Sequence, residues 1–96
     1  MVIGKVVGTV VATRKHERLV GGKIQVIQPL EPSSLEPDGA LFVAIDAVGA
    51  GIGEQVLIAQ GSAARKAIDN ESAPVDATIV GIIDEIDIPN GRPNKR

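Results

Sequence analysis

Apolar residues gather in five stretches of this chain, and β-branched side chains predominate in them. The stretches cover Val2–Val11, Lys23–Leu30, Leu41–Val48, Glu54–Gln60 and Ala77–Ile83. Segments rich in Gly, Pro, Asn and Ser separate them, and such segments are typical of turns. This spacing predicts five short strands joined by loops, the arrangement of a small all-β barrel or sandwich.

One segment has the composition of a helix. Residues Ser62–Asp69 are rich in Ala and have room for about two turns, and Ser62 is a suitable N-cap. A single short helix excludes an alternating strand–helix architecture. In the first strand, Gly4 and Gly8 are expected to share a face, where they would let the strand bend as barrel closure requires.

The predicted strands are apolar on both faces. The third stretch places Val43 and Ile45 on one face and Phe42 and Ala44 on the other. The fifth stretch is apolar on both sides as well, with Ile79 and Ile83 on one face and Val80 and Ile82 on the other. A domain of this size has one core to fill, and one short helix cannot cover the outer faces. We therefore expect those faces to be buried against other copies of the chain, in a homo-oligomer.

Length, composition and charge narrow the function. With 96 residues, the chain is expected to form one domain over residues 1–88, followed by a flexible polar tail over residues 89–96. It has no Cys, a formal net charge of −2, and neither a signal peptide nor an apolar run long enough to span a membrane. These features favour a cytoplasmic protein with no affinity for membranes and no disulfide or thiolate site.

Two segments resemble catalytic or cofactor motifs but lack parts of them. The glycines of residues 48–54 resemble a dinucleotide-binding turn, but Glu54 occupies the place of the third glycine and a strand follows instead of a helix. Ser62 lacks the second glycine of a nucleophile elbow, and His16, the only histidine, is expected in an exposed loop. The glycine loop is therefore expected to make a tight turn that suits close approach near a symmetry axis.

Metal and nucleic-acid binding are also disfavoured. The acidic run Asp84–Asp87 is too short for a calcium loop and is more typical of a charged edge strand. The basic loop Arg14–Arg18 would suit nucleic acid, but Phe42 is the only aromatic residue and it lies in an apolar strand. No catalytic, cofactor-binding or metal-binding residues are predicted.

Several ordered blocks resemble one family, the bacterial microcompartment vertex proteins, which are pentameric shell proteins of carboxysomes and of ethanolamine, propanediol and glycyl-radical compartments. The resemblance runs from Gly4 to Ile88. It is carried by residues 8–15 (GTVVATRK), 19–23 (LVGGK), 43–46 (VAID), 48–57 (VGAGIGEQVL), 61–65 (GSAAR) and 74–84 (PVDATIVGIID).

The resemblance implies a five-stranded barrel of the oligonucleotide-binding type that assembles as a homopentamer and is not an enzyme. Such rings close the corners of a cytoplasmic protein shell, so hexameric shell proteins are the implied partners. The implied subunit contacts around the axis are Gly49, Ala50, Gly51, Ile52, Gly53, Glu54, Gly61, Ser62 and Arg65. Glu54 is expected either to pair with Arg65 or a neighbour's backbone amides, or to hold its own loop. The alternative function is a small nucleic-acid-binding barrel.

Overall fold

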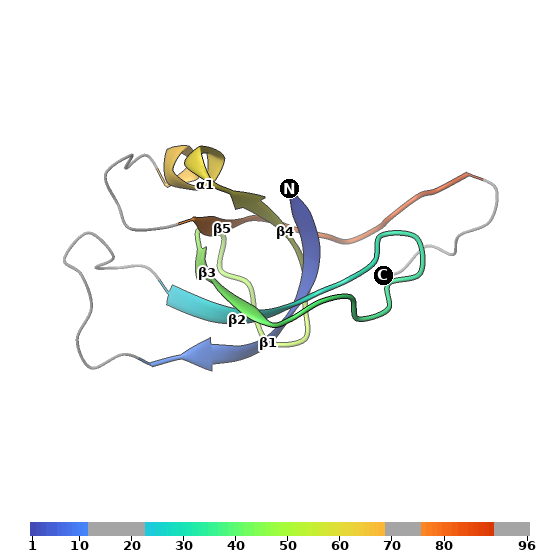
Figure 1. Cartoon of the computed structure of the whole chain (residues 1–96), viewed down its shortest axis with the longest axis horizontal. Helices are drawn as coiled ribbons and strands as arrows, with labels where there is room; N and C mark the ends of the chain where they lie inside the picture. Colours follow the sequence, from blue (N-terminus) through green and yellow to red (C-terminus); the bar gives the residue numbers. More distant parts are fainter. Residues whose placement is uncertain (12–22, 69–75, 90–96) are drawn as a thin grey trace.

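The computed structural model describes residues 1–11, 23–68 and 76–89. It contains five strands and one helix (Figure 1). The elements are β1 (Val2–Val10), β2 (Lys23–Pro29), β3 (Phe42–Asp46), β4 (Gln55–Gln60), α1 (Ser62–Ala67) and β5 (Ala77–Ile82). The predicted strands and helix are confirmed, with ends that differ by one to a few residues. His16, the basic loop Arg14–Arg18 and all of the predicted tail except Pro89 lie outside the described residues.

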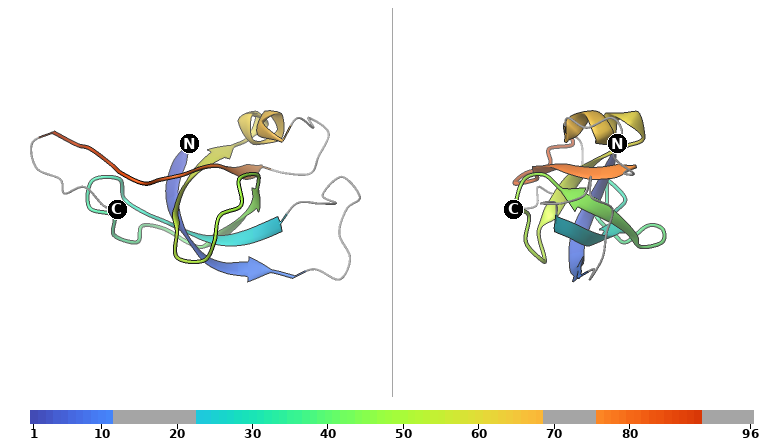
Figure 2. Two further views of the ribbon diagram at one scale, coloured as in Figure 1. Left: turned by 180° about the vertical axis from the view of Figure 1, so that it is seen from behind. Right: turned by 90° about the vertical axis from the view of Figure 1, so that its left-hand side faces the viewer.

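The strands form a closed barrel in the order β1-β2-β3-β5-β4. All neighbouring pairs are antiparallel except β3 and β5, which run parallel. The parallel pair joins strands that are not consecutive in the chain, and it completes the ring of strands seen in Figure 2. The expected five-stranded all-β barrel is thus confirmed.

The prediction that Gly4 and Gly8 share a face is wrong. The register of β1 against β2 shifts between Val6 and Gly8, so one extra residue lies in β1. Such a bulge reverses which side the following residues occupy. Gly4 faces the interior, where an added Cβ would lie 2.5 Å from Cγ2 of Ile27, whereas Gly8 pairs with outward-facing Val26.

A second register shift lies between β4 and β5. It makes Val80 the extra residue, since Ile58 pairs with Ile79 and Leu57 pairs with Gly81. Ile82 then pairs with Val56, a fully buried residue of β4. The expectation that Ile79 and Ile82 lie on opposite faces is therefore also wrong, because both pair with buried residues of β4 and strict alternation holds only in an unbulged strand.

The barrel interior is filled by aliphatic side chains from all five strands. Each strand contributes alternate residues, as expected of strands with one face toward a core. The buried cluster consists of Val6, Ile27, Ala44, Ala50, Val56, Ile58, Ala77 and Ile79, with Val2 and Phe42 partly buried against it. The core of the domain is thus complete within one subunit.

Helix α1 lies outside the barrel, against β4 and β5 (Figure 1). Its Ala64 packs against Ile45 in a second small cluster that includes Ile24 and Ile68. The prediction that Ser62 is the N-cap is wrong: Gly61 is the N-cap residue, with φ of 63°, and no side chain bonds to the helix start. In the described part of the chain, no helix is long and apolar enough to cross a membrane.

Candidate functional site

The nine predicted contact residues fall into two segments of the fold. Six of them lie in the loop that joins β3 to β4, and Gly61, Ser62 and Arg65 lie at the turn into α1 and within that helix. In Figure 2 the loop and the helix lie on different sides of the barrel. The structure therefore does not bring the two predicted segments together within one subunit.

The side chain of Asp46 organises the loop. Its Oδ1 accepts hydrogen bonds from the backbone N–H of Val48 (2.9 Å) and Gly49 (2.8 Å). Its Oδ2 accepts one from the backbone N–H of Ala50 (2.8 Å). An aspartate at the end of a strand that bonds to the amides after it is a common way to build a tight turn. Asp46 was not among the predicted site residues.

A buried polar side chain supports this arrangement from inside the barrel. Gln25 of β2 is fully buried, and its Nε2 donates to the carbonyl oxygen of Ala50 (2.8 Å) and to Oδ2 of Asp46 (3.3 Å). Its Oε1 accepts a hydrogen bond from the hydroxyl of Thr9 (2.7 Å). Residues of β1, β2 and β3 therefore hold the start of the loop together.

The far end of the loop is attached to β1. The backbone N–H of Gly53 donates to the carbonyl of Val6 (2.8 Å), and the N–H of Val6 donates to the carbonyl of Glu54 (3.0 Å). Positive φ angles at Gly49 (82°) and Gly53 (96°) allow the turns between these attachments. The loop thus has a defined shape within a single subunit.

Fewer of the predicted contact residues are available on the surface of the loop than the sequence suggested. Ala50 is fully buried and belongs to the barrel core, so its side chain is not on the surface. The side chain of Glu54 accepts a hydrogen bond from the N–H of Gly51 (2.6 Å), which matches the alternative in which Glu54 holds its own loop. Ile52 is 68% exposed and is the more exposed of two large apolar side chains on the loop, the other being Val48.

A second apolar surface lies on the outer side of β1, β2 and β3. Val26 and Val43 pair across β2 and β3 and face outward, and Val43 is 53% exposed. Val7 and Leu41 are exposed nearby, and we call these four residues the outer apolar face. Ile45, expected on the same face, is covered by α1. The helix therefore covers only part of the surplus apolar surface, as the sequence indicated.

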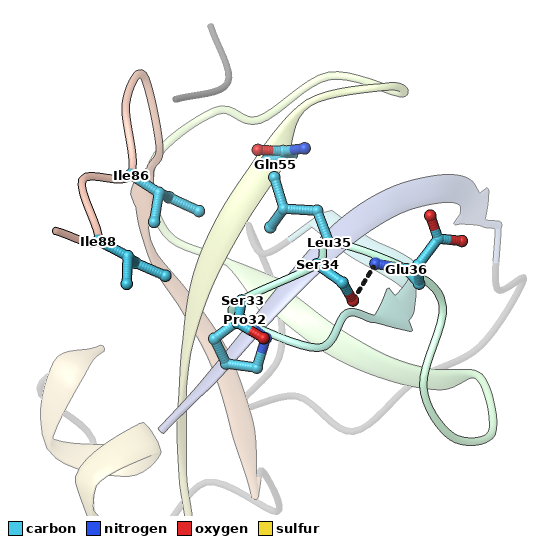
Figure 3. A pocket seen from close by; sticks show the side chains of 8 residues that line it. All are labelled: Pro32, Ser33, Ser34, Leu35, Glu36, Gln55, Ile86 and Ile88. Atoms are coloured by element: carbon cyan, nitrogen blue, oxygen red, sulfur yellow. Dashed lines mark hydrogen bonds between the residues drawn. The ribbon is translucent and has the colours of Figure 1, made fainter. Parts of the chain in front are cut away.

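A mixed polar and apolar hollow lies elsewhere, beside the turn at residues 32–36, and has no catalytic set. Figure 3 shows this space of about 210 Å³ between the turn at residues 32–36 and Ile86 and Ile88. One carboxylate, Glu36, lines it among hydroxyl, amide and aliphatic groups. Within the described ranges no three His, Cys, Asp or Glu side chains gather as a metal site would require.

The chain thus forms a small β-barrel whose exposed apolar surfaces suit association with other proteins. Residues 1–84 match the family described as "Ethanolamine utilisation protein EutN/carboxysome". The chain belongs to this family, and the predicted family membership is confirmed.

Two relatives of this chain are named as shell vertex proteins. The bacterial microcompartment shell vertex protein GrpN of Rhodospirillum rubrum (strain F11) is 44% identical over 90 residues, which span 94% of this chain and 100% of that protein. The carboxysome shell vertex protein CcmL of Synechocystis sp. (strain ATCC 27184 / PCC 6803 / Kazusa) is 46% identical over 91 residues, or 95% of this chain and 90% of that protein. These relatives are structural shell proteins, which supports the expectation that the chain is not an enzyme.

Solved structures agree with the fold. The structure titled "Carboxysome Subunit, CcmL" has a TM-score of 0.88 at 46% identity and covers 100% of both chains. The structure titled "GrpN pentameric microcompartment shell protein from Rhodospirillum rubrum" has a TM-score of 0.82 at 44% identity and covers 92% of this chain and 99% of that one. At this identity and coverage the likeness extends to the whole barrel.

Proposed function

We propose that this chain is the vertex subunit of a bacterial microcompartment shell and that five copies form a ring. The observation that carries the proposal is the match over nearly the whole chain to shell vertex proteins, one of them described as pentameric. The exposed loop residue Ile52 and the outer apolar face give a physical reason for association, because both would be exposed to solvent in an isolated subunit.

A ring places a constraint on the subunit surface. In a cyclic ring the interfaces are head-to-tail, so each copy contacts its two neighbours through two different surfaces. The ring closes when the repeated rotation returns to the first copy. The loop at residues 49–54 and the outer apolar face are separate surfaces that suit these two roles. We assign the loop to the contacts around the axis, together with Gly61, Ser62 and Arg65 of the helix segment.

We further propose that hexameric shell proteins surround this ring. A sheet of hexagonal tiles is flat, and five-fold units introduce the curvature that closes it. The ring would therefore act by shape and not by chemistry, in a shell located in the cytoplasm. Coexpression with hexameric shell proteins tests this: closed shells should form with the chain present, and open or elongated assemblies without it.

The ring itself is tested by native mass spectrometry of the purified full chain. Five subunits of 9.9 kDa give a particle of about 50 kDa. A monomer that binds oligonucleotides more weakly as salt rises would instead favour the alternative, a nucleic-acid-binding barrel.

Val43→Asp should separate folding from assembly. Val43 is 53% exposed in the subunit, so the barrel should keep its fold, but a carboxylate buried in a subunit contact would be unpaired and costly. We expect folded monomers by circular dichroism and native mass spectrometry. Val11→Asp, at a 92% exposed valine beyond β1, is the matched control and should keep the ring. An intact ring in Val43→Asp would remove the outer apolar face from the proposal.

A further inference from the structure

We infer that Asp46 is the positioning residue of the loop at residues 47–54, and that it fixes the shape of this loop through donors of the same subunit. The resemblance and the glycine pattern point to the exposed part of the loop. The group that selects its conformation lies at the end of β3, where Asp46 pairs with Lys23 of β2 and Ile79 of β5.

The hydrogen bonds of Asp46 match the capacity of a carboxylate. An ionised carboxylate accepts only, and it offers about four lone-pair sites on two oxygens. Oδ1 receives the backbone N–H groups of Val48 and Gly49. Oδ2 receives the N–H of Ala50 and Nε2 of Gln25. An asparagine would place a donor where two of these four donors arrive, so the arrangement requires Asp.

Gln25 makes this anchor part of the barrel interior. Its fully buried amide uses one N–H for Asp46, the other for the carbonyl of Ala50, and its oxygen for the hydroxyl of Thr9. In the described part of the chain, no buried side-chain nitrogen or oxygen lacks a partner. A fully satisfied polar cluster of this kind specifies one geometry, because any other leaves a buried group unpaired.

The glycines permit the loop conformation but do not choose it. Gly49 and Gly53 have positive φ angles, and glycine reaches many other conformations at little cost. Asp46 removes that freedom. If the loop forms contacts around a ring axis, which rests on the proposed function, a preformed loop lowers the entropic cost of association.

The test is hydrogen–deuterium exchange on the full chain, read by mass spectrometry, for wild type and Asp46→Ala. We expect the amides of Val48, Gly49 and Ala50 to exchange at least about tenfold faster in the variant, with peptides from β4 and β5 unchanged. Asp46→Asn should give an intermediate rate, because one oxygen still accepts. Gln25→Leu should speed exchange of these amides less than Asp46→Ala does, because Asp46 keeps its three backbone donors although the carbonyl of Ala50 loses its partner.

Asp84→Asn is the matched control, since Asp84 is an exposed carboxylate beyond β5. In this variant the amides of Val48, Gly49 and Ala50 should exchange as in wild type. Unchanged exchange of the loop amides in Asp46→Ala would overturn the inference. Faster exchange throughout the barrel in Asp46→Asn would also overturn it, because Asp46 would then hold the barrel and not the loop. Native mass spectrometry of the same samples reports the ring separately, so a monomeric wild type would reject the proposed function while leaving the loop test valid.

Discussion

Two turns of this molecule are each built around one carboxylate, but only one of them is joined to the barrel interior. At residues 31–36, Oε1 of Glu31 accepts hydrogen bonds from the backbone N–H groups of Ser33 (2.9 Å) and Ser34 (2.7 Å) and from the Ser33 hydroxyl (2.5 Å). At residues 46–50, Asp46 accepts three backbone N–H groups in a similar way. The local chemistry of the two turns is nearly the same.

Their surroundings differ. The turn at residues 31–36 closes on itself, with the N–H of Glu31 bonded to the carbonyl of Glu36 (2.9 Å) and that of Leu35 to the carbonyl of Glu31 (2.7 Å). It projects from one end of the barrel, beside Ile86 and Ile88 (Figure 3). The loop after Asp46 instead buries Ala50 in the core and bonds to Gln25. A carboxylate forms a turn in both places, and tertiary contacts decide whether the turn is coupled to the fold.

The largest expected effect comes from the buried alanine of the coupled loop. Ala50→Leu would force extra methylene groups into a filled core and should lower the free energy of unfolding by about 1–3 kcal/mol. Ala40→Leu, at an exposed position before β3, should change it by less than about 0.5 kcal/mol. Urea unfolding followed by circular dichroism, at one fixed protein concentration, measures both. Equal effects would show that the two loops are coupled to the core to the same degree.

A smaller effect is expected from one glycine in each region. Gly53 (φ 96°) and Gly39 (φ 108°) have backbone conformations that side chains disfavour, so alanine at either position should cost about 1–2 kcal/mol. Only Gly53→Ala should also shift native mass spectra from ring to monomer, because Gly53 lies in the proposed contact loop. Loss of the ring in Gly39→Ala as well would assign the connection between β2 and β3, which contains Gly39, to the subunit contacts.

The smallest effect concerns acid and the exposed turn. Hydrogen bonds from Ser33 and Ser34 lower the pKa of Glu31 below its ordinary value. A lowered pKa in the folded state means that the turn is stabilised above the ordinary carboxyl pKa and loses this stabilisation as pH falls through the folded value. NMR shifts of the Ser33 and Ser34 amides should follow this titration. In Glu31→Gln the side chain does not titrate, and an unchanged acid response there would contradict the assignment.

The sequence predicted where the strands form, but it did not always predict which face of a strand a residue occupies. β-branched residues and turn residues predicted all five strands, because both depend on local backbone preferences. The faces of Gly8 and Ile82 were wrong, because each follows a bulge that only pairing with the next strand creates. The N-cap was wrong because the sharp turn from β4 places Gly61, and not Ser62, at the start of the helix.

The loop that we propose for the subunit contacts was indicated by its glycines and by the family resemblance, while the residues that hold it were missed. Asp46 gave a usable signal, since an aspartate at a strand end before a glycine-rich turn often bonds to the following amides. Gln25 gave one too, because it alternates with Ile27 and so falls on the inner face of β2. What could not be predicted is that Gln25, Asp46 and Thr9 meet, since they belong to three different strands.

The sequence by itself determined where strands, turns and the short helix form, and it indicated more apolar surface than one subunit can bury. Those properties follow from each residue and its near neighbours in the chain. The tertiary structure decided the parallel closure of β3 on β5, the side of each bulged residue and the polar cluster behind the loop. These depend on contacts between residues far apart in the chain, whose cost in chain entropy is recovered only when the whole barrel closes.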